Sequence, residues 1–325
     1  MPTPPLRRAL VLTAGLGTRL RPLTLVRAKP AIPVAGEPLV RRIVRWLAAH
    51  GLTEVVLNLH HLPATITAAV GDGSDLGSLV RYSWEQPQVL GSAGGPRQAL
   101  PILGADAFLI VNGDTLSDFD LAALTDAHCS SGALATLALV PNQEPEQYGG
   151  VQLDTGSRVT GFVPRGQPAV GSFHFVGVQA VQAAAFQSLP AGQAMNSIGG
   201  LYDDLIATRP GSVRGVVREA AFWDVGTVTD YWRTSFALMS PSRPAHEWRG
   251  RNVHVDERAR ISRSILWDDI EIGAGSVLEE CIVTDGVKVP AGAVYRRSIL
   301  VRANGGLSMT SFDATREQRN ESTDR

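Results

Sequence analysis

A glycine-rich segment with closely spaced arginines lies near the start of the chain, over residues 13–24. It reads Thr-Ala-Gly-Leu-Gly-Thr-Arg-Leu-Arg-Pro-Leu-Thr and places Thr18 and Arg19 directly after Gly15 and Gly17. Glycines let several backbone N–H groups converge on one phosphate, and arginines add positive charge. The first sixty residues hold nine arginines or lysines and only two acidic residues, which also favours a phosphorylated ligand.

Two other glycine-rich phosphate-binding motifs do not fit this segment. A dinucleotide-binding fold would use Glu37, about 20 residues farther on, but Leu20 stands at the third glycine position. A Walker A motif would need Gly-Lys-Ser or Gly-Lys-Thr, and neither follows the loop. The segment therefore predicts a phosphate-binding loop of another kind.

Lysine is rare in this sequence, which makes Lys29 a candidate for chemistry. Of 30 basic residues only Lys29 and Lys288 are lysine. A compact ammonium can serve where the planar guanidinium of arginine does not fit. Because Pro30 and Pro33 restrict the nearby backbone, we expect the ammonium of Lys29 to be held in one place. The alternative is a solvated surface lysine.

Two aspartates are candidates for holding a metal ion. An apolar strand ends in Asn-Gly-Asp at Asp114, and Asp224 lies between the bulky residues Trp223 and Val225. Mg²⁺ takes one or two carboxylates together with substrate phosphates. We therefore expect Asp114 and Asp224 to bind Mg²⁺. For Asp114 alone, an aspartate that only stabilises a turn is the alternative.

The chain up to residue 240 alternates strands with helices that can position these candidates. This alternation predicts an α/β fold with a Rossmann-like, mainly parallel sheet and helices on both faces. Ligands of such sheets bind at the carboxyl ends of the strands, where the loops after Thr13 and Val111 fall. The expected strands are Ala9–Thr13, Glu54–Leu59, Leu79–Trp84 and Ala107–Val111, and the expected helices are Pro38–His50, Pro96–Leu103, Leu121–Ser130 and Thr229–Met239.

The sequence changes character after residue 240, where Pro-Ser-Arg-Pro indicates a linker. Residues 272–277 and 289–294 repeat a six-residue theme of an apolar residue, small turn residues and a β-branched residue. This repeat predicts a short left-handed parallel β-helix, with an antiparallel meander as the alternative.

We expect a first domain over 1–240, the partial β-helix over 241–303 and a disordered polar tail over 304–325. Two or three coils are few for independent stability. The β-helix should therefore pack on the first domain or on another copy of the chain in a homo-oligomer.

The overall composition argues against several classes of protein. A net charge of −1 does not fit a globally basic nucleic-acid binder. No run of 18 apolar residues occurs, so we expect no helix that spans a membrane. The two cysteines, Cys129 and Cys281, lie far apart and in no Cys-x-x-Cys pair, which predicts a reducing, cytoplasmic compartment.

Six motifs follow one another along the chain. They are the glycine-rich segment, Lys-Pro at 29, Leu-Gly-Ser-Ala-Gly-Gly from 90, Asn-Gly-Asp up to 114, Tyr-Gly-Gly from 148 and Trp-Asp-Val-Gly-Thr up to 227. In this order they resemble the sugar-1-phosphate nucleotidylyltransferases, also called NDP-sugar pyrophosphorylases. The resemblance covers about residues 6–240, and the β-helix extends it toward the mannose-1-phosphate guanylyltransferase-like branch.

The resemblance implies a role for individual residues. Arg19 and Lys29 would act in catalysis, and Asp114 and Asp224 would bind Mg²⁺. The other implied residues are Ala14, Gly15, Gly17, Thr18, Gln86, Gly91 and Ser92 for the nucleotide, and Gly149, Arg165 and Thr227 for the sugar phosphate.

The chain departs from the family pattern at two places. Ala28 stands where the family often has proline. Residues 162–166 read Phe-Val-Pro-Arg-Gly where the family has Phe-x-Glu-Lys-Pro, so Arg165 would replace the lysine that meets the sugar phosphate.

The family's reaction transfers a nucleotidyl group from an NTP to a sugar 1-phosphate and releases pyrophosphate. The tail architecture favours GTP and mannose 1-phosphate, and Glu85 could accept from a guanine edge unless it is a solvated charge at a strand end. A UTP- or dTTP-dependent enzyme is one alternative. A catalytically weak subunit that senses nucleotide sugars is another, motivated by the altered segment around Arg165.

Overall fold

The computed structural model describes residues 6–239, 247–303 and 306–312. These residues form two compact units. The first comprises the described residues up to Gly15 together with Val40–Trp223, and the second comprises Leu16–Leu39 together with the described residues from Asp224 on. This grouping differs from the division at residue 240 expected from the sequence, because residues 16–39 pack with the C-terminal part of the chain.

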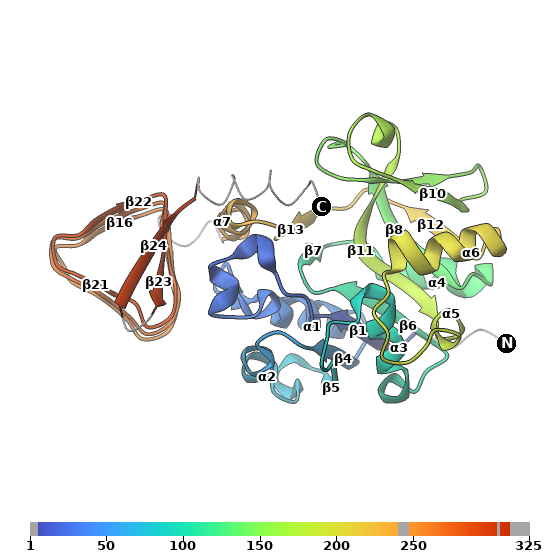
Figure 1. Cartoon of the computed structure of the whole chain (residues 1–325), viewed down its shortest axis with the longest axis horizontal. Helices are drawn as coiled ribbons and strands as arrows, with labels where there is room; N and C mark the ends of the chain where they lie inside the picture. The colour runs from blue at the N-terminus through green and yellow to red at the C-terminus, as the bar shows by residue number, and fades with distance from the viewer. Residues whose placement is uncertain (1–5, 240–246, 304–305, 313–325) are drawn as a thin grey trace. The chain divides into compact units, whose positions relative to one another are not determined.

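A nine-stranded mixed sheet is the centre of the first unit (Figure 1). Its strands are β1 (Arg8–Leu12), β4 (Glu54–Leu59), β5 (Leu79–Trp84), β6 (Ala107–Asn112), β8 (Ala135–Pro141), β9 (Gly150–Leu153), β10 (Val159–Val163), β11 (Phe173–Gln182) and β12 (Val213–Val217). The main path is β10–β9–β11–β6–β1–β4–β5, and β8 joins β11 to β12. The four strands expected from the sequence are confirmed to within one residue at each end.

The sheet is parallel where the glycine-rich segment begins and mixed elsewhere. β1 pairs in parallel with β4 and β6, and β4 pairs in parallel with β5. β11 runs antiparallel to β6 and β8. The carboxyl ends of β1, β4, β5 and β6 therefore lie at one edge, which is the place expected for a ligand.

Helices and loops bury both faces of this sheet. The helices of the first unit are α1 (Leu39–Ala49), whose first residue belongs to the second unit, α2 (Pro63–Val70), α3 (Gly91–Leu103), α4 (Leu121–Ser131), α5 (Ala184–Gln187) and α6 (Tyr202–Thr208). Ala9, Leu10 and Val11 are all 0% exposed. Because successive residues of a strand point to opposite faces, both faces of β1 are covered. This agrees with the expected α/β fold.

Several short elements lie outside this sheet. Two short strands, β2 (Pro33–Val34) and β3 (Glu37–Pro38), follow the glycine-rich segment. β7 (Thr115–Ser117) follows β6, and β13 (Phe222–Asp224) and α7 (Val228–Ala237) follow β12. Three single turns of 3₁₀-helix, Thr18–Leu20, Leu23–Leu25 and Lys29–Ala31, lie in the segment between β1 and β2. A 3₁₀ turn is short and tightly wound, so this segment changes direction repeatedly.

The second unit contains a parallel β-helix, drawn in orange and red in Figure 1. Its strands are β14 (Glu247–Arg249), β15 (Val253–Val255), β16 (Arg260–Ser262), β17 (Ser264–Leu266), β18 (Ile270–Ile272), β19 (Val277–Glu279), β20 (Ile282–Val283), β21 (Lys288–Val289), β22 (Val294–Arg296) and β23 (Ser298–Ala303). Every ladder between successive coils is parallel. The predicted β-helix is therefore confirmed, and the antiparallel meander is excluded for this part of the chain.

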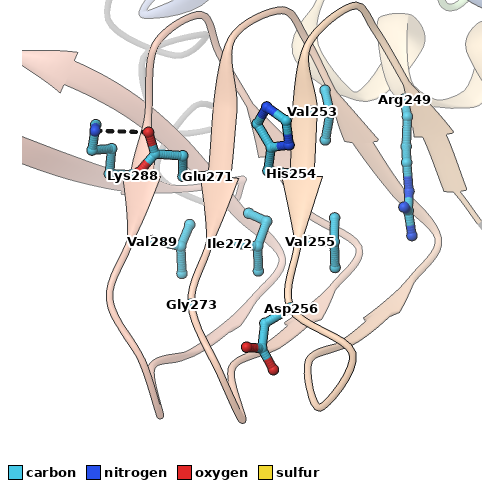
Figure 2. Close-up of a pocket in the computed structure, with 10 residues that line it drawn as sticks. All are labelled: Arg249, Val253, His254, Val255, Asp256, Glu271, Ile272, Gly273, Lys288 and Val289. Carbon is cyan, nitrogen blue, oxygen red and sulfur yellow. Dashed lines mark hydrogen bonds and ion pairs between the residues drawn. The ribbon is translucent and has the colours of Figure 1, made fainter.

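One face of the β-helix carries a row of polar side chains, shown in Figure 2. His254, Glu271 and Lys288 occupy matching positions on β15, β18 and β21. Lys288 Nζ lies 2.7 Å from Glu271 Oε1, 17 residues earlier. All three side chains are exposed, so this ladder is a solvated face of the β-helix.

The tail expected to be disordered is ordered in part. β24 (Gly306–Ser311) pairs antiparallel with β23, and Met309 lies opposite Leu300. The expectation of disorder is therefore wrong for residues 306–311, because the last coil of the β-helix offers β24 an edge to pair with. Residues 304–305 and 313–325 lie outside the described residues. Within the described chain, the helices are too short or too polar to cross a membrane.

Candidate functional site

The glycine-rich segment and Asp114 both follow the carboxyl ends of neighbouring strands. Leu12 at the end of β1 is in register with Asn112 at the end of β6, and the Gly113 N–H donates to Leu12 O at 3.0 Å. Ala14 and Gly15 therefore lie beside Asp114 at one edge of the sheet. Gly15 is exposed and Asp114 is half-buried. This edge can present backbone N–H groups and one carboxylate to a ligand.

A buried hydrogen-bond chain connects this loop with the segment after β5. Asn58 Oδ1 accepts from the Thr13 N–H at 2.6 Å, and Asn58 Nδ2 donates to Glu85 Oε1 at 2.6 Å. The other carboxylate oxygen, Glu85 Oε2, accepts from the Leu90 N–H at 2.7 Å. Glu85 is 0% exposed. The expectation of a solvated or base-binding Glu85 is therefore wrong, because both oxygens are already used inside the protein.

Asn58 is a positioning candidate that the sequence analysis missed, and Glu85 was given a different role there. They position the start of the glycine-rich loop and the start of α3 relative to each other. The signal available in the sequence was one amide near the end of β4 and one carboxylate just after β5, two adjacent strands that end at the same edge.

The residues expected at the base lie at the beginning of α3. Gly91 is its first residue, with φ of 75°, a conformation that favours glycine. The helix therefore begins five residues before the expected Pro96. The glycines in the first turns of α3 allow close packing, since a Cβ at Gly94 would lie 2.3 Å from Gln193 O. Glycine at position 94 is needed for this contact with the backbone of Gln193 and does not indicate a loop.

The loop around Met195 packs against this helix start. The N–H groups of Ala93 and Gly94 donate to Met195 O at 2.9 and 3.2 Å. Ser92 Oγ accepts from the Ser197 N–H at 2.8 Å and lies 2.9 Å from Ser197 Oγ. The hydroxyl of Ser92 thus holds the loop, and Gln86, after β5, is exposed.

The second unit holds the remaining part of the glycine-rich segment. Gly17 has φ of 60°, and a Cβ there would lie 2.8 Å from Thr24 Cγ2 and 3.2 Å from Lys29 Cβ. Thr24 Oγ1 donates to Gly17 O at 2.9 Å. Gly17 and the Lys29 Cβ are therefore neighbours in this segment. Thr18 and Arg19 are exposed.

Lys29 is 9% exposed, so the interpretation as a solvated surface lysine is wrong. It begins a 3₁₀ turn that the Ala31 N–H closes by donating to Ala28 O at 2.8 Å. Burial of a charged lysine is costly and requires compensating interactions. The backbone on both sides of Lys29 is therefore well defined.

Asp224 and Thr227 lie at the junction of β13 and α7. Asp224 ends β13, and a Cβ at Gly226 would lie 3.0 Å from Asp224 Oδ2. Thr227 is the N-cap of α7: its hydroxyl accepts from the Asp230 N–H at 3.2 Å and donates to Asp230 Oδ2 at 2.6 Å. Capping by threonine stabilises a helix start, so Thr227 has a structural role in addition to any contact with sugar.

Asp114 and Asp224 belong to different units, and each is half-buried. Carboxylate oxygens are ligands that Mg²⁺ prefers, and two of them suffice when phosphates complete the shell. Throughout residues 6–239, 247–303 and 306–312 there is no group of three or more His, Cys, Asp or Glu side chains placed to hold a metal. Each of these aspartates therefore offers one carboxylate within its own unit.

The residues expected at the sugar phosphate, Gly149 and Arg165, come together in the first unit. A Cβ at Gly149 would lie 2.9 Å from Val163 O and 3.7 Å from the Arg165 N atom. The Gly166 N–H donates to Pro145 O at 2.7 Å and thereby ties the Arg165 turn to the segment before Gly149. The Arg165 side chain is exposed, so it can reach a phosphate.

A cavity of about 280 Å³ lies next to Gly149 in the same unit. Its wall includes a cluster of tilted aromatic rings, with Tyr148 and His174 centroids 4.2 Å apart and His174 and Phe222 centroids 4.7 Å apart. Burial lowers the pKa of His174 to about 4, so its imidazole is neutral at pH 7. Asn142 Oδ1, also at the cavity, is buried without a hydrogen-bond partner among the described residues.

Comparison with known proteins decides the family. Residues 8–240 match the nucleotidyl transferase family model. The chain belongs to this family. Residues 246–295 of this nucleotidyl transferase also match the GlmU-like C-terminal hexapeptide model, which agrees with the left-handed β-helix expected from the sequence.

The nucleotidyl transferase is similar to several curated enzymes. It is 34% identical over 299 residues to the mannose-1-phosphate guanylyltransferase of Mycobacterium tuberculosis, covering 89% of this chain and 83% of the relative. It is 36% identical over 223 residues to the N-acetylmuramate alpha-1-phosphate uridylyltransferase of Neisseria meningitidis, covering 68% and 94%. It is 29% identical over 310 residues to the UTP–glucose-1-phosphate uridylyltransferase of Synechocystis, covering 90% and 79%.

These names share transfer to a sugar 1-phosphate and differ in base and sugar. The chain is therefore a sugar-1-phosphate nucleotidylyltransferase, as the motifs indicated. The fold is also that of the HddC protein of Yersinia pseudotuberculosis, solved in complex with GMP-PN. The TM-score is 0.61 at 21% identity, and the match covers 72% of this chain and 100% of HddC.

Proposed function

We propose that this chain transfers a guanylyl group from GTP to mannose 1-phosphate, giving GDP-mannose and pyrophosphate. The observation that carries the choice of substrates is the similarity to the mycobacterial mannose-1-phosphate guanylyltransferase. That match covers 89% of the chain and therefore extends past residue 240 into the β-helix. The uridylyltransferase relatives make a UTP-dependent enzyme the main alternative, and a dTTP-dependent one remains open.

In this proposal the triphosphate is bound by the glycine-rich segment. Ala14, Gly15 and Gly17 bring the backbone to the phosphates, and the exposed Thr18 and Arg19 add a hydroxyl and a positive charge. Gln86, Gly91 and Ser92 face the base. Because the hydroxyl of Ser92 already contacts Ser197, its contribution would come from the backbone.

The reaction needs no general base. A phosphate oxygen of the sugar 1-phosphate attacks the α-phosphorus of the NTP, and pyrophosphate leaves. The second pKa of a phosphate monoester is about 6, so the nucleophile is already anionic at neutral pH. His60 follows β4, and its Nδ1 lies 2.9 Å from Glu85 O. The proposed reaction does not require His60 as a base.

Because two anions must meet, the protein has to neutralise charge and position the reactants. Lys29 and Arg19 would supply positive charge beside the phosphates. Asp114 and Asp224 would hold Mg²⁺, which supplies further charge neutralisation at phosphate oxygens when it is bound.

The sugar would occupy the cavity beside Gly149, with Arg165 on its phosphate and Thr227 near the ring. The polar side chains of Asn142 and Gln143 line this cavity and support the placement of a sugar there. The adjoining rings of Tyr148 and His174 offer a wall to this cavity.

A second candidate function is a catalytically weak subunit that binds nucleotide sugars. The observation behind it is the altered turn at Pro164, Arg165 and Gly166. Against it, Arg165 remains exposed beside Gly149, where a guanidinium can bind phosphate through two hydrogen bonds.

We further propose a cytoplasmic location, supported by the absence of a disulfide at Cys129 or Cys281. A homo-oligomer remains a proposal from the sequence, because the β-helix already packs on residues 16–39 of its own chain.

The choice of substrates is tested by steady-state kinetics with purified protein and Mg²⁺. GTP, ATP, UTP and dTTP are each combined with the 1-phosphates of mannose, glucose and N-acetylmuramate. We expect the highest kcat/KM for GTP with mannose 1-phosphate. A higher value for UTP with another sugar would replace the proposed pair by the main alternative.

A further inference from the structure

Arg27, two residues before Lys29, is bound by the β-helix. Its Nε donates to Asp285 Oδ2 at 2.7 Å, and its Nη2 donates to Asp285 Oδ1 at 2.7 Å. Nη2 also donates to Asp268 Oδ2 at 2.8 Å. The Arg27 side chain is 17% exposed, so these charge-assisted bonds are largely shielded from water.

The two aspartates that hold Arg27 are themselves held by the β-helix backbone. They are 17 residues apart, at matching turns of two successive coils, and the Asp268 N–H donates to Asp285 Oδ1 at 3.1 Å. Asp268 Oδ1 accepts from the Arg251 N–H at 2.8 Å. The backbone of the β-helix therefore orients both carboxylates independently of their contacts with Arg27.

A second contact anchors the chain on the other side of Lys29. The Tyr231 hydroxyl donates to Pro33 O at 2.8 Å, and Trp267 Nε1 donates to the Tyr231 oxygen at 2.9 Å. Tyr231 and Trp267 are both 0% exposed. The Trp267 ring also lies under the Arg27 guanidinium, 5.3 Å from its centroid. Trp267 thus contributes to both anchors.

A lysine at position 27 could not make these contacts. Its single ammonium is a point charge, whereas the planar guanidinium matches a carboxylate through two parallel bonds and stacks on an aromatic ring. Burial by itself would lower the pKa of Arg27, but the hydrogen bonds and charges of Asp285 and Asp268 outweigh burial and raise it. Arg27 is therefore a largely buried cation whose charge is paired with the carboxylates of Asp268 and Asp285.

We infer that the β-helix holds the Lys29 segment in its working conformation, and that Arg27, Asp285 and Trp267 are positioning residues for the transfer reaction. The catalytic part of this inference rests on the proposed role of Lys29. The turn at Lys29 is fixed at Arg27 on one side and Pro33 on the other, and both anchors end on two successive coils of the β-helix. The β-helix is therefore part of the catalytic machinery.

The experiment compares Arg27→Gln and Asp285→Asn with the wild-type full-length protein. Amide hydrogen exchange is measured without ligands, and kcat and KM are measured with GTP and mannose 1-phosphate. Glu271→Gln is the matched control, since it breaks an ion pair between successive coils on the solvated face seen in Figure 2. Exchange within β4, in the first unit, reports whether each variant remains folded.

We expect exchange of the Ala31 and Ile32 amides to rise at least tenfold in both variants, with β4 unchanged. We expect kcat to fall at least tenfold and KM for GTP to change less than threefold, because the contact acts on position and not on ground-state binding. The double variant should be no worse than the more affected single variant, because both substitutions remove one contact. Glu271→Gln should match wild type.

Unchanged exchange at Ala31 and Ile32 in both variants would overturn the inference. Faster exchange with unchanged kcat would uphold the structural support and instead refute the catalytic role proposed for Lys29. Trp267→Phe gives an independent check. It removes the indole N–H and keeps an aromatic ring, so it should loosen the Pro33 side with a smaller loss of kcat.

Discussion

The side chain of Asn58 donates to the buried carboxylate of Glu85 at 2.6 Å. Through Thr13 on one side and Leu90 on the other, this bond connects the glycine-rich loop with the first turn of α3. The two loops expected to bind triphosphate and base are thus joined inside the protein, away from the ligand. A buried network of this kind is stable only if every member keeps its partner.

Glu85→Gln should destabilise the protein although it changes few atoms. A glutamine amide offers one acceptor where the carboxylate offers two, so either Asn58 Nδ2 or the Leu90 N–H loses its partner. We expect the free energy of unfolding to fall by about 1–3 kcal/mol, the cost of a buried unsatisfied donor. Urea denaturation measures it, and Glu271→Gln on the exposed face of the β-helix should change it by less than about 0.5 kcal/mol. Equal values for the two variants would contradict the network.

Replacement of either metal-binding candidate should abolish turnover and leave the fold intact. Asp114→Asn and Asp224→Asn each remove a charged Mg²⁺ ligand while keeping the shape of the side chain. We expect kcat to fall at least 100-fold, which corresponds to about 2.7 kcal/mol of activation free energy. Circular dichroism should match wild type. Activity near the wild-type level in either variant would remove that aspartate from the mechanism.

Lys29→Arg should be poorly tolerated, although arginine supplies nearly all the positive charge in this chain. Lys29 is 9% exposed and its Cβ faces Gly17 closely. A bulkier planar guanidinium should not reproduce the position of a compact ammonium in this buried segment. We expect kcat to fall at least tenfold. Retention of more than about half the activity, a change below 1 kcal/mol, would refute this interpretation.

Arg165→Ala distinguishes the enzyme from the sensing subunit. If Arg165 binds the sugar phosphate, KM for mannose 1-phosphate should rise about tenfold or more, since a charge-assisted hydrogen bond contributes about 1.5–3 kcal/mol. KM for GTP should change much less. The neighbouring Gln167→Ala, also exposed, serves as the control. Unchanged kinetics in Arg165→Ala would show that this turn is only a solvated loop.

The stability of the first unit should decrease as the pH falls from about 6.5 to 4. Burial lowers the pKa of His128 from 6.5 to about 4, and this residue is 1% exposed. Between these values the unfolded chain binds a proton that the folded chain excludes. This lowers the free energy of unfolding by up to about 1.4 kcal/mol per pH unit.

His128 packs between Thr136 and Gln182, at 2.9 and 3.1 Å. His128→Gln should therefore lower stability at pH 7 but show a shallower loss between pH 6.5 and 4. Urea denaturation at several pH values measures this difference in slope. Parallel pH profiles for the variant and the wild type would contradict a depressed pKa at His128.

Local sequence patterns were enough to predict the parallel strands and the β-helix. β1, β4 and β6 are short, mainly apolar runs, whereas β5 mixes apolar residues with Arg81 and Ser83. The six-residue repeat after residue 270 has few structural alternatives. The strands β8–β12 were not predicted. β11 pairs antiparallel with β6, β8 and β9 across long stretches of sequence, and periodicity does not reveal such pairing.

The site was predicted as a set of residues and not as an arrangement. The grouping of residues 16–39 with the β-helix depends on contacts such as Arg27 with Asp285, 258 residues apart. Glu85 could not be placed from sequence, because its burial follows from two partners on different segments. The start of α3 was missed because glycines that allow close packing look the same in sequence as glycines of a loop.

Pyrophosphate release by the wild-type protein tests the central claim most directly. With GTP, mannose 1-phosphate and Mg²⁺ present, we predict one pyrophosphate released for each GDP-mannose formed. We predict none when either substrate or the metal is omitted. A protein that binds GTP but releases no pyrophosphate with any NTP and sugar 1-phosphate would contradict the account and identify a sensing subunit.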